Sequence, residues 1–159
     1  MKVIKRTAVL LGVVLVLIQL VRPARTNPPV DESRTIQALT RMPPEVAAIF
    51  ERSCKDCHSY RTQWPWYSQI APVSWYVIND VNEGRRNLIL SDWASYDRKK
   101  SLKRLDDICD EVGKGDMPLP TYVFIHSIAR LSDADRSLLC NWTNAERSRI
   151  ESDATGNAQ

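Results

Sequence analysis

The feature that most constrains this chain is a pair of cysteines, Cys54 and Cys57, spaced three positions apart and followed directly by His58. On a helix this spacing places both thiols and the imidazole on adjacent turns of one surface. Two thiols so placed can add across the vinyl groups of a porphyrin, and the imidazole can then bind its iron. The pattern predicts one covalent haem c, attached through Cys54 and Cys57, with His58 as the proximal ligand. The fold must wrap around that group.

Two other interpretations use the same three residues. A redox-active dithiol normally opens a helix after a strand, whereas the pair at Cys54 closes a predicted helix. A structural zinc site needs a second pair of ligands, and His126, Cys109 and Cys140 do not form one at the usual spacing. Haem attachment is therefore the preferred interpretation of the motif.

A haem iron that transfers electrons needs a sixth ligand. Met117 is the predicted distal ligand, because Gly115 frees the backbone before it and Pro118 stiffens the loop after it. Met42 falls just before the first predicted helix of the domain. His126 is the alternative distal ligand, and a five-coordinate or water-bound iron is a third arrangement.

The N-terminus is typical of an export or membrane element. Three basic residues, at positions 2, 5 and 6, precede an apolar run from Ala8 to Val21. Residues 1–22 are predicted to be an uncleaved signal anchor, with a cleaved signal peptide as the alternative. Either arrangement exports the remainder of the chain.

Charge excludes one class of function. Beyond the first 21 residues, 19 basic residues face 19 acidic ones. A nucleic-acid binder needs a basic excess to displace counterions from phosphates, so no nucleic-acid partner is expected.

Cys109 and Cys140 remain after the motif cysteines are assigned. Both are predicted on inward faces of helices, and an oxidising compartment lets such a pair form a disulfide where the Cα atoms approach within about 7 Å. Buried free thiols are the alternative.

No strand-like alternation is visible, so the predicted fold is all-α: a small cytochrome c-like helical domain wrapped around one covalently attached haem. Proline-rich residues 23–43 are predicted to be an extended linker, residues 44–147 the haem domain, and residues 148–159 a disordered tail. The helices expected in the domain are one from Pro44 to the motif, one over about 72–90, one capped by Asp97 and ended by Gly113 and Gly115, and one capped by Ser132 with Asp135.

The surroundings of the haem are less constrained. A backbone carbonyl in the turn at residues 70–72 is the expected acceptor for the second ring nitrogen of His58. Arg85 and Arg86 are candidate partners for the propionates. The dense tryptophans and tyrosines between Trp64 and Trp93 are expected in the core or in the haem wall.

Several motifs together resemble the haem-binding domain family of bacterial c-type cytochrome-like proteins, over roughly residues 27–142. They are Asn27-Pro28-Pro29-Val30-Asp31, the Cys54–His58 motif running into Trp64-Pro65-Trp66-Tyr67-Ser68, Ile70-Ala71-Pro72-Val73-Ser74-Trp75, Gly115-Asp116-Met117-Pro118-Leu119-Pro120 and Leu131-Ser132-Asp133. One departure is Ser127, since the histidine at this place is often followed by proline in the family. The resemblance implies a single-pass monohaem protein of the inner membrane, with its haem domain on the periplasmic side.

The leading functional hypothesis is a membrane-tethered cytochrome that carries electrons to or from redox partner proteins in the membrane or periplasm, rather than an enzyme. A small peroxidase or gas sensor with an open iron position is the alternative, for which His126 is the spare histidine. A tethered assembly module that uses haem only structurally is a third hypothesis.

Overall fold

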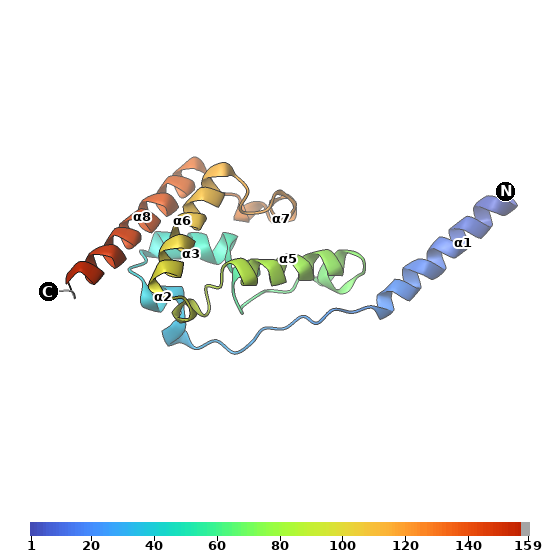
Figure 1. Cartoon of the computed structure of the whole chain (residues 1–159). Coiled ribbons are helices and arrows are strands. Elements are labelled where there is room, and N and C mark those ends of the chain that lie inside the picture. The colour runs from blue at the N-terminus through green and yellow to red at the C-terminus, as the bar shows by residue number, and fades with distance from the viewer. Residues whose placement is uncertain (157–159) are drawn as a thin grey trace.

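The structure, a computed structural model, describes residues 1–156, and over that range it is all-α. One helix stands apart from a helical domain, and an extended segment connects the two (Figure 1). The α-helices are α1 (Lys2–Leu17), α2 (Ile36–Leu39), α3 (Pro44–Ser53), α4 (Lys55–His58), α5 (Val73–Asn87), α6 (Arg98–Lys114), α7 (Pro120–Ile125) and α8 (Asp133–Gly156). The 3-10 turns are η1 (Ile18–Leu20), η2 (Glu32–Arg34), η3 (Trp66–Gln69), η4 (Trp93–Ser95) and η5 (Ser127–Ala129).

Local capping sets the ends of the long helices, as the sequence predicts. The Asp97 carboxylate accepts a hydrogen bond from a backbone N–H in the first turn of α6. That helix continues past Gly113 and ends where Gly115 adopts the left-handed conformation at φ 82°. At the start of α8, Ser132 and Asp135 exchange side-chain and backbone hydrogen bonds, which is a capping box.

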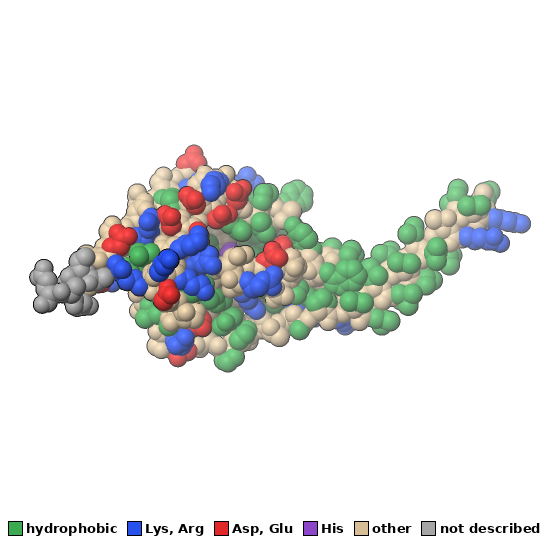
Figure 2. Space-filling view, viewed as in Figure 1, with side chains coloured by type: hydrophobic (Ala, Val, Ile, Leu, Met, Phe, Trp, Pro, Cys, Tyr) green, Lys and Arg blue, Asp and Glu red, His purple; other side chains and the backbone are tan. Residues whose placement is uncertain are grey.

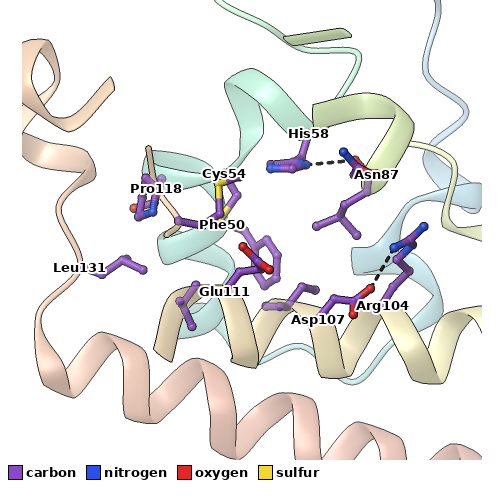
Figure 3. A pocket seen from close by; sticks show the side chains of 14 residues that line it. Phe50, Cys54, His58, Asn87, Arg104, Asp107, Glu111, Pro118 and Leu131 are labelled. Carbon is purple, nitrogen blue, oxygen red and sulfur yellow. Dashed lines mark hydrogen bonds and ion pairs between the residues drawn. The ribbon is translucent and has the colours of Figure 1, made fainter. Parts of the chain in front are cut away.

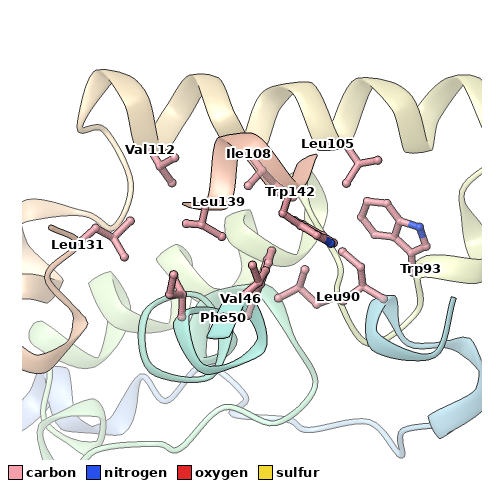
Figure 4. Close-up of a cluster of buried hydrophobic side chains, with 12 residues drawn as sticks. Val46, Phe50, Leu90, Trp93, Leu105, Ile108, Val112, Leu131, Leu139 and Trp142 are labelled. Atoms are coloured by element: carbon pink, nitrogen blue, oxygen red, sulfur yellow. The ribbon is translucent and has the colours of Figure 1, made fainter. Parts of the chain in front are cut away.

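The core lies where α3 packs against the pair formed by α6 and α8. Phe50 of α3 meets Trp142 of α8 edge to face, with ring centroids 5.5 Å apart. Leu105 and Leu139, one from each helix of the pair, are fully buried in the same cluster (Figure 4). Since α6 also lines the cavity described below, this core holds one wall of the candidate site.

The two long helices of this pair are covalently joined. Cys109 of α6 and Cys140 of α8 form a disulfide with a Cα–Cα distance of 4.7 Å. This is the pairing that the sequence predicts.

The domain begins earlier than the sequence predicts. Residues 23–43 are predicted to be a linker, yet η2 and α2 form within them and the Ile36 side chain is fully buried. The backbone N–H of Ile36 donates to the Leu90 carbonyl, which fixes this segment to the domain. Because Ile36 is buried and bonded to the domain, the domain starts at about Glu32 and not at residue 44.

The domain also ends later than predicted. Residues 148–159 are predicted to be disordered, but α8 continues to Gly156 and Ile150 packs against the core. Residues 157–159 lie outside the described part of the chain.

The remaining extended segment is attached to the domain along its length. Arg25 donates to the Ser68 carbonyl, and Asn27 donates to the Thr62 carbonyl. Arg85 of α5 reaches the same segment by donating to the Asn27 side chain. The segment is extended, as predicted, but it follows the surface of the domain.

Candidate functional site

The motif cysteines and His58 lie at the junction of α3 and α4. Proline at the first position of α3 starts this helix, and its buried face includes Val46 and Phe50. The helix breaks at Cys54, where ψ is −34° with φ at −121°, and α4 restarts at once. The His58 N–H donates to the Cys54 carbonyl at 3.0 Å, so thiol and imidazole stand one turn apart.

A cavity of about 390 Å³ opens beside this junction. Its size falls within the range of small-molecule and cofactor pockets. Figure 3 shows its walls, which come from α3, α4, α5, α6 and the loop after α6. The lining residues are Phe50, Ser53, Cys54, His58, Asn87, Leu88, Arg104, Asp107, Ile108, Glu111, Val112, Met117, Pro118 and Leu131.

His58 is oriented by the end of α5. Its Nδ1 lies 3.0 Å from the Gly84 carbonyl oxygen and 3.2 Å from that of Leu88. Because carbonyls only accept, Nδ1 carries the proton and Nε2 keeps its lone pair. Burial lowers the pKa of His58, which also favours the neutral ring. A neutral imidazole with a free Nε2 is the form that ligates a metal.

This arrangement corrects one prediction. The acceptor for His58 was expected in the turn at residues 70–72, but the Ala71 backbone is instead bonded to Gln19. The true acceptors lie at the opposite end of α5, because that end packs against the motif.

The two motif thiols differ in their placement. Both are free, but only Cys54 lines the cavity. Burial raises the pKa of Cys54 to about 12. Burial together with nearby Asp56 and Asp80 raises the pKa of Cys57 to about 12 as well. Both thiols are therefore protonated at neutral pH, unlike the activated thiol of a dithiol oxidoreductase.

Of the two candidate distal ligands, only Met117 lines the cavity. Its backbone is fixed by a hydrogen bond from its N–H to the Glu111 carbonyl at the end of α6. His126 is outside the cavity wall, where it stacks on Tyr122 with ring centroids 4.3 Å apart. Its Nε2 lies 3.4 Å from the Tyr67 hydroxyl.

Two residues of the cavity wall each carry a buried polar atom that lacks a hydrogen-bond partner. These atoms are the Nε of Arg104 and the Oγ of Ser53. Asp107 holds Arg104 through Nη1 at 2.9 Å, which leaves the Nε–H of the guanidinium unpaired. An unpaired buried donor of positive charge suits a carboxylate ligand such as a haem propionate. Together with the free Nε2 of His58, this donor set fits a haem.

The sequence predicts Arg85 and Arg86 as propionate partners, whereas the arginine that lines the cavity is Arg104. Arg85 is occupied by the Ser59 carbonyl and by the extended segment, and Arg86 pairs with Glu83 on the surface. The sequence gives only a weak indication that Arg104 faces the cavity. This residue lies one turn before the buried Ile108 on α6, at the edge of the face that packs inward.

The structure gives no support to a zinc centre. Within residues 1–156, no group of three or more histidine, cysteine, aspartate or glutamate side chains is arranged to hold a metal ion. A haem needs only one such side chain on its iron, with the porphyrin supplying the other ligands in its plane.

Comparison with known proteins agrees with the donor set. The family described as Haem-binding domain matches residues 13–145, which is most of the chain. No curated protein and no solved structure matched the chain.

Proposed function

The chain belongs to the haem-binding domain family, and from this premise we propose that it is a membrane-tethered monohaem c-type cytochrome that transfers electrons. One observation carries the proposal. A single cavity holds Cys54, His58 and Met117, and the imidazole is already fixed with Nε2 free.

In this proposal the chain holds the haem from several sides. Cys54 and Cys57 form the thioethers, and His58 is the proximal ligand. Arg104 and Ser53 offer hydrogen-bond donors to a propionate, since both have unpaired buried atoms in the wall. Phe50 and the neighbouring apolar side chains exclude water.

Haem supplies an iron centre that exchanges one electron between its ferrous and ferric forms. The residues of the chain set how readily this occurs. The Gly84 and Leu88 carbonyls accept from Nδ1 and make the imidazole a better donor. Met117 offers a thioether as sixth ligand, which favours the ferrous form and raises the reduction potential.

Two observations support a location outside the cytoplasm. Residues Lys2–Leu20 form a helix long and apolar enough to cross a membrane, and none of it is buried in the domain. The Cys109–Cys140 disulfide is typical of an oxidising compartment. The proposal therefore puts the haem domain on the periplasmic side of the inner membrane, where a redox partner protein can reach it.

A haem enzyme or gas sensor is the second candidate. Asn87 and Arg104 line the cavity, and side chains of these types assist ligand chemistry at an open iron. His126, the histidine that this function would use, lies outside the cavity wall.

Visible spectra of the exported full-length protein test the proposal. Under denaturing conditions the haem should stay bound to the chain, and its pyridine adduct should show two thioethers. The native spectrum should be low-spin in both oxidation states, with a methionine-to-iron band in the ferric form. Rapid binding of carbon monoxide by the ferrous protein would favour the second candidate, and loss of haem on denaturation would contradict covalent attachment.

A further inference from the structure

One end of the domain carries exposed apolar side chains beside the exit of α1. Trp66 is 73% exposed and Tyr76 is 54% exposed, while Ile70 and Val73 are each 47% exposed. We call these four residues the apolar end. In Figure 2, hydrophobic side chains gather where the domain meets the N-terminal helix.

The apolar end is directly bonded to the segment that leaves α1. The Gln19 side chain exchanges two hydrogen bonds with the Ala71 backbone, at 3.0 and 2.9 Å. The Trp75 indole N–H donates to the Val21 carbonyl at 2.8 Å. The last turn of the apolar helix and the start of α5 are therefore one contiguous surface.

The length of the N-terminal helix places this surface relative to a bilayer. Lys2–Leu20 contains 19 residues, or roughly 28 Å of helix, which matches a hydrocarbon core of about 30 Å. The helix is just long enough to span, so Gln19 must lie at the outer boundary. The residues bonded to it lie at the same depth.

The chemistry of the apolar end matches that boundary. Residues 62–79 contain no charged residue, in a chain where 26% of residues are charged. Tryptophan and tyrosine concentrate at membrane interfaces, where the ring is apolar and its N–H or O–H stays hydrated. Arg22 and Arg25 follow directly and suit the phosphates of lipid headgroups.

We infer that the apolar end, formed by Trp66, Ile70, Val73 and Tyr76, rests in the headgroup layer of the bilayer that α1 crosses. This inference rests on the membrane anchor of the proposed function. It adds that the domain is not free to reorient relative to the membrane, because the apolar end contacts the bilayer in addition to the spanning helix α1.

A consequence concerns the position of the haem motif. His58 is bonded to Gly84 and Leu88, at the other end of α5 from the apolar end. The helix has 15 residues, so its two ends are roughly 22 Å apart. A domain seated on its apolar end holds the motif away from the lipid, at a fixed height and accessible to a soluble partner.

Hydroxyl-radical footprinting of the full-length protein tests this inference. The protein is placed at one copy per nanodisc of phosphatidylethanolamine and phosphatidylglycerol, and oxidation is located by mass spectrometry. Phe124 is 88% exposed on α7 and serves as the internal reference. The measured quantity is the oxidation of Trp66 and of Tyr76, each divided by that of Phe124. Each ratio should be about threefold lower than the exposed fractions of these side chains in the free domain predict.

A charge variant gives the matched comparison. Val73→Glu places a carboxylate in the first turn of α5, where the helix dipole favours it, so folding is preserved. It should restore oxidation of Trp66 and Tyr76, because a carboxylate opposes seating in the headgroups. Ile128→Glu, at an apolar site on η5 that is 76% exposed against 47% for Val73, should leave the oxidation of Trp66 and Tyr76 unchanged.

The outcomes separate this inference from the proposed function. Extraction of the chain by alkaline carbonate, or absence of covalent haem, would contradict the proposed function itself. A carbonate-resistant, haem-loaded protein in which the oxidation of Trp66 and Tyr76, relative to Phe124, equals what their exposure in the free domain predicts would overturn the inference alone. Protection that grows with the number of copies per nanodisc would assign the apolar end to a second copy of the chain and overturn it as well.

Discussion

Gly84 lies so close to Cys57 that a Cβ at position 84 would stand 2.6 Å from the Cys57 carbonyl oxygen. Only a glycine lets α5 approach the haem motif this closely. The contact matters because the Gly84 carbonyl also accepts the hydrogen bond from His58 Nδ1. One residue thus sets both the packing of α5 on the motif and the orientation of the His58 imidazole.

We expect Gly84→Ala to push α5 away from the motif. The clash involves backbone atoms that cannot rotate aside, so a loss of about 1–3 kcal/mol in the free energy of unfolding is expected. The lengthened bond to His58 should also lower the yield of low-spin haem protein. Denaturant melts and visible spectra measure the two effects.

Gly113→Ala is the matched control, because a Cβ there meets nothing within 4 Å and the position is inside α6. It should be neutral or stabilise by about 1 kcal/mol or less. Equal effects of the two substitutions would contradict the role of close approach.

Met117→Ala tests the distal ligand. Removing the thioether should eliminate the methionine-to-iron band and lower the reduction potential by more than about 59 mV, a tenfold change in a one-electron equilibrium. Met42 is also half-buried against the core but does not line the cavity. Met42→Ala should therefore keep the band, and an unchanged spectrum in Met117→Ala would rule out this ligand.

What the sequence predicts well in this protein is local. The Cys54–His58 spacing, the Asp97 cap and the Ser132–Asp135 capping box each involve residues within four positions of one another. Such features depend on residues that are close together in the sequence, so they can be interpreted from the sequence alone.

What the sequence does not predict depends on packing between distant segments. Gly84 and His58 are 26 positions apart, and nothing in either segment indicates that they meet. Ile36 is one apolar residue in a proline-rich stretch, and its burial depends on α3 and α6 being in place. Lys103 and Arg104 look equivalent on α6, and only the packed helix decides which of them lines the cavity.

Arg104→Gln tests the propionate contact. Loss of a positive charge beside the haem stabilises the ferric form, so the reduction potential should fall by about 30–60 mV. The potential should also depend more steeply on pH, because a propionate without its cationic partner titrates at higher pH.

Lys103→Gln is the matched control for this charge. Lys103 also pairs with Asp107, at 2.8 Å, but it is exposed and does not line the cavity. The reduction potential of the Lys103→Gln variant, and the dependence of that potential on pH, should both match those of the wild type. If the two substitutions gave equal shifts, the effect would be one of net charge and not of a propionate contact.

The Cys109–Cys140 disulfide closes a loop across 31 positions. Replacing both cysteines by serine should lower the free energy of unfolding by about 3–4 kcal/mol, chiefly by relaxing the unfolded chain. Dithiothreitol should reproduce this loss in the wild type without releasing haem, because thioethers are not reduced by thiols. Release of haem by dithiothreitol would show that the motif cysteines are not thioether-bonded.

Tyr122 joins α7 to the haem motif, since its hydroxyl donates to the Asp56 carboxylate at 2.8 Å. Asp56 lies between Cys54 and Cys57, so this bond links the segment that follows Met117 to the Cys54–His58 motif. Tyr122→Phe should cost about 1–2 kcal/mol of unfolding free energy, and the looser loop should weaken the methionine-to-iron band. Tyr76→Phe, at an exposed tyrosine of α5, should change neither quantity.

The pH dependence of the same pair gives a second test. Burial, and then the bond to Asp56, raise the pKa of Tyr122 above its usual value. Tyr122 therefore ionises at lower pH in the unfolded chain than in the folded one. The stabilisation from its bond to Asp56 is complete below about pH 10 and is lost as pH rises above that value. The difference in unfolding free energy between wild type and Tyr122→Phe should accordingly be constant from neutral pH to about 10 and shrink beyond. A difference that already declines near neutral pH would mean that Tyr122 is not the protonated donor to Asp56.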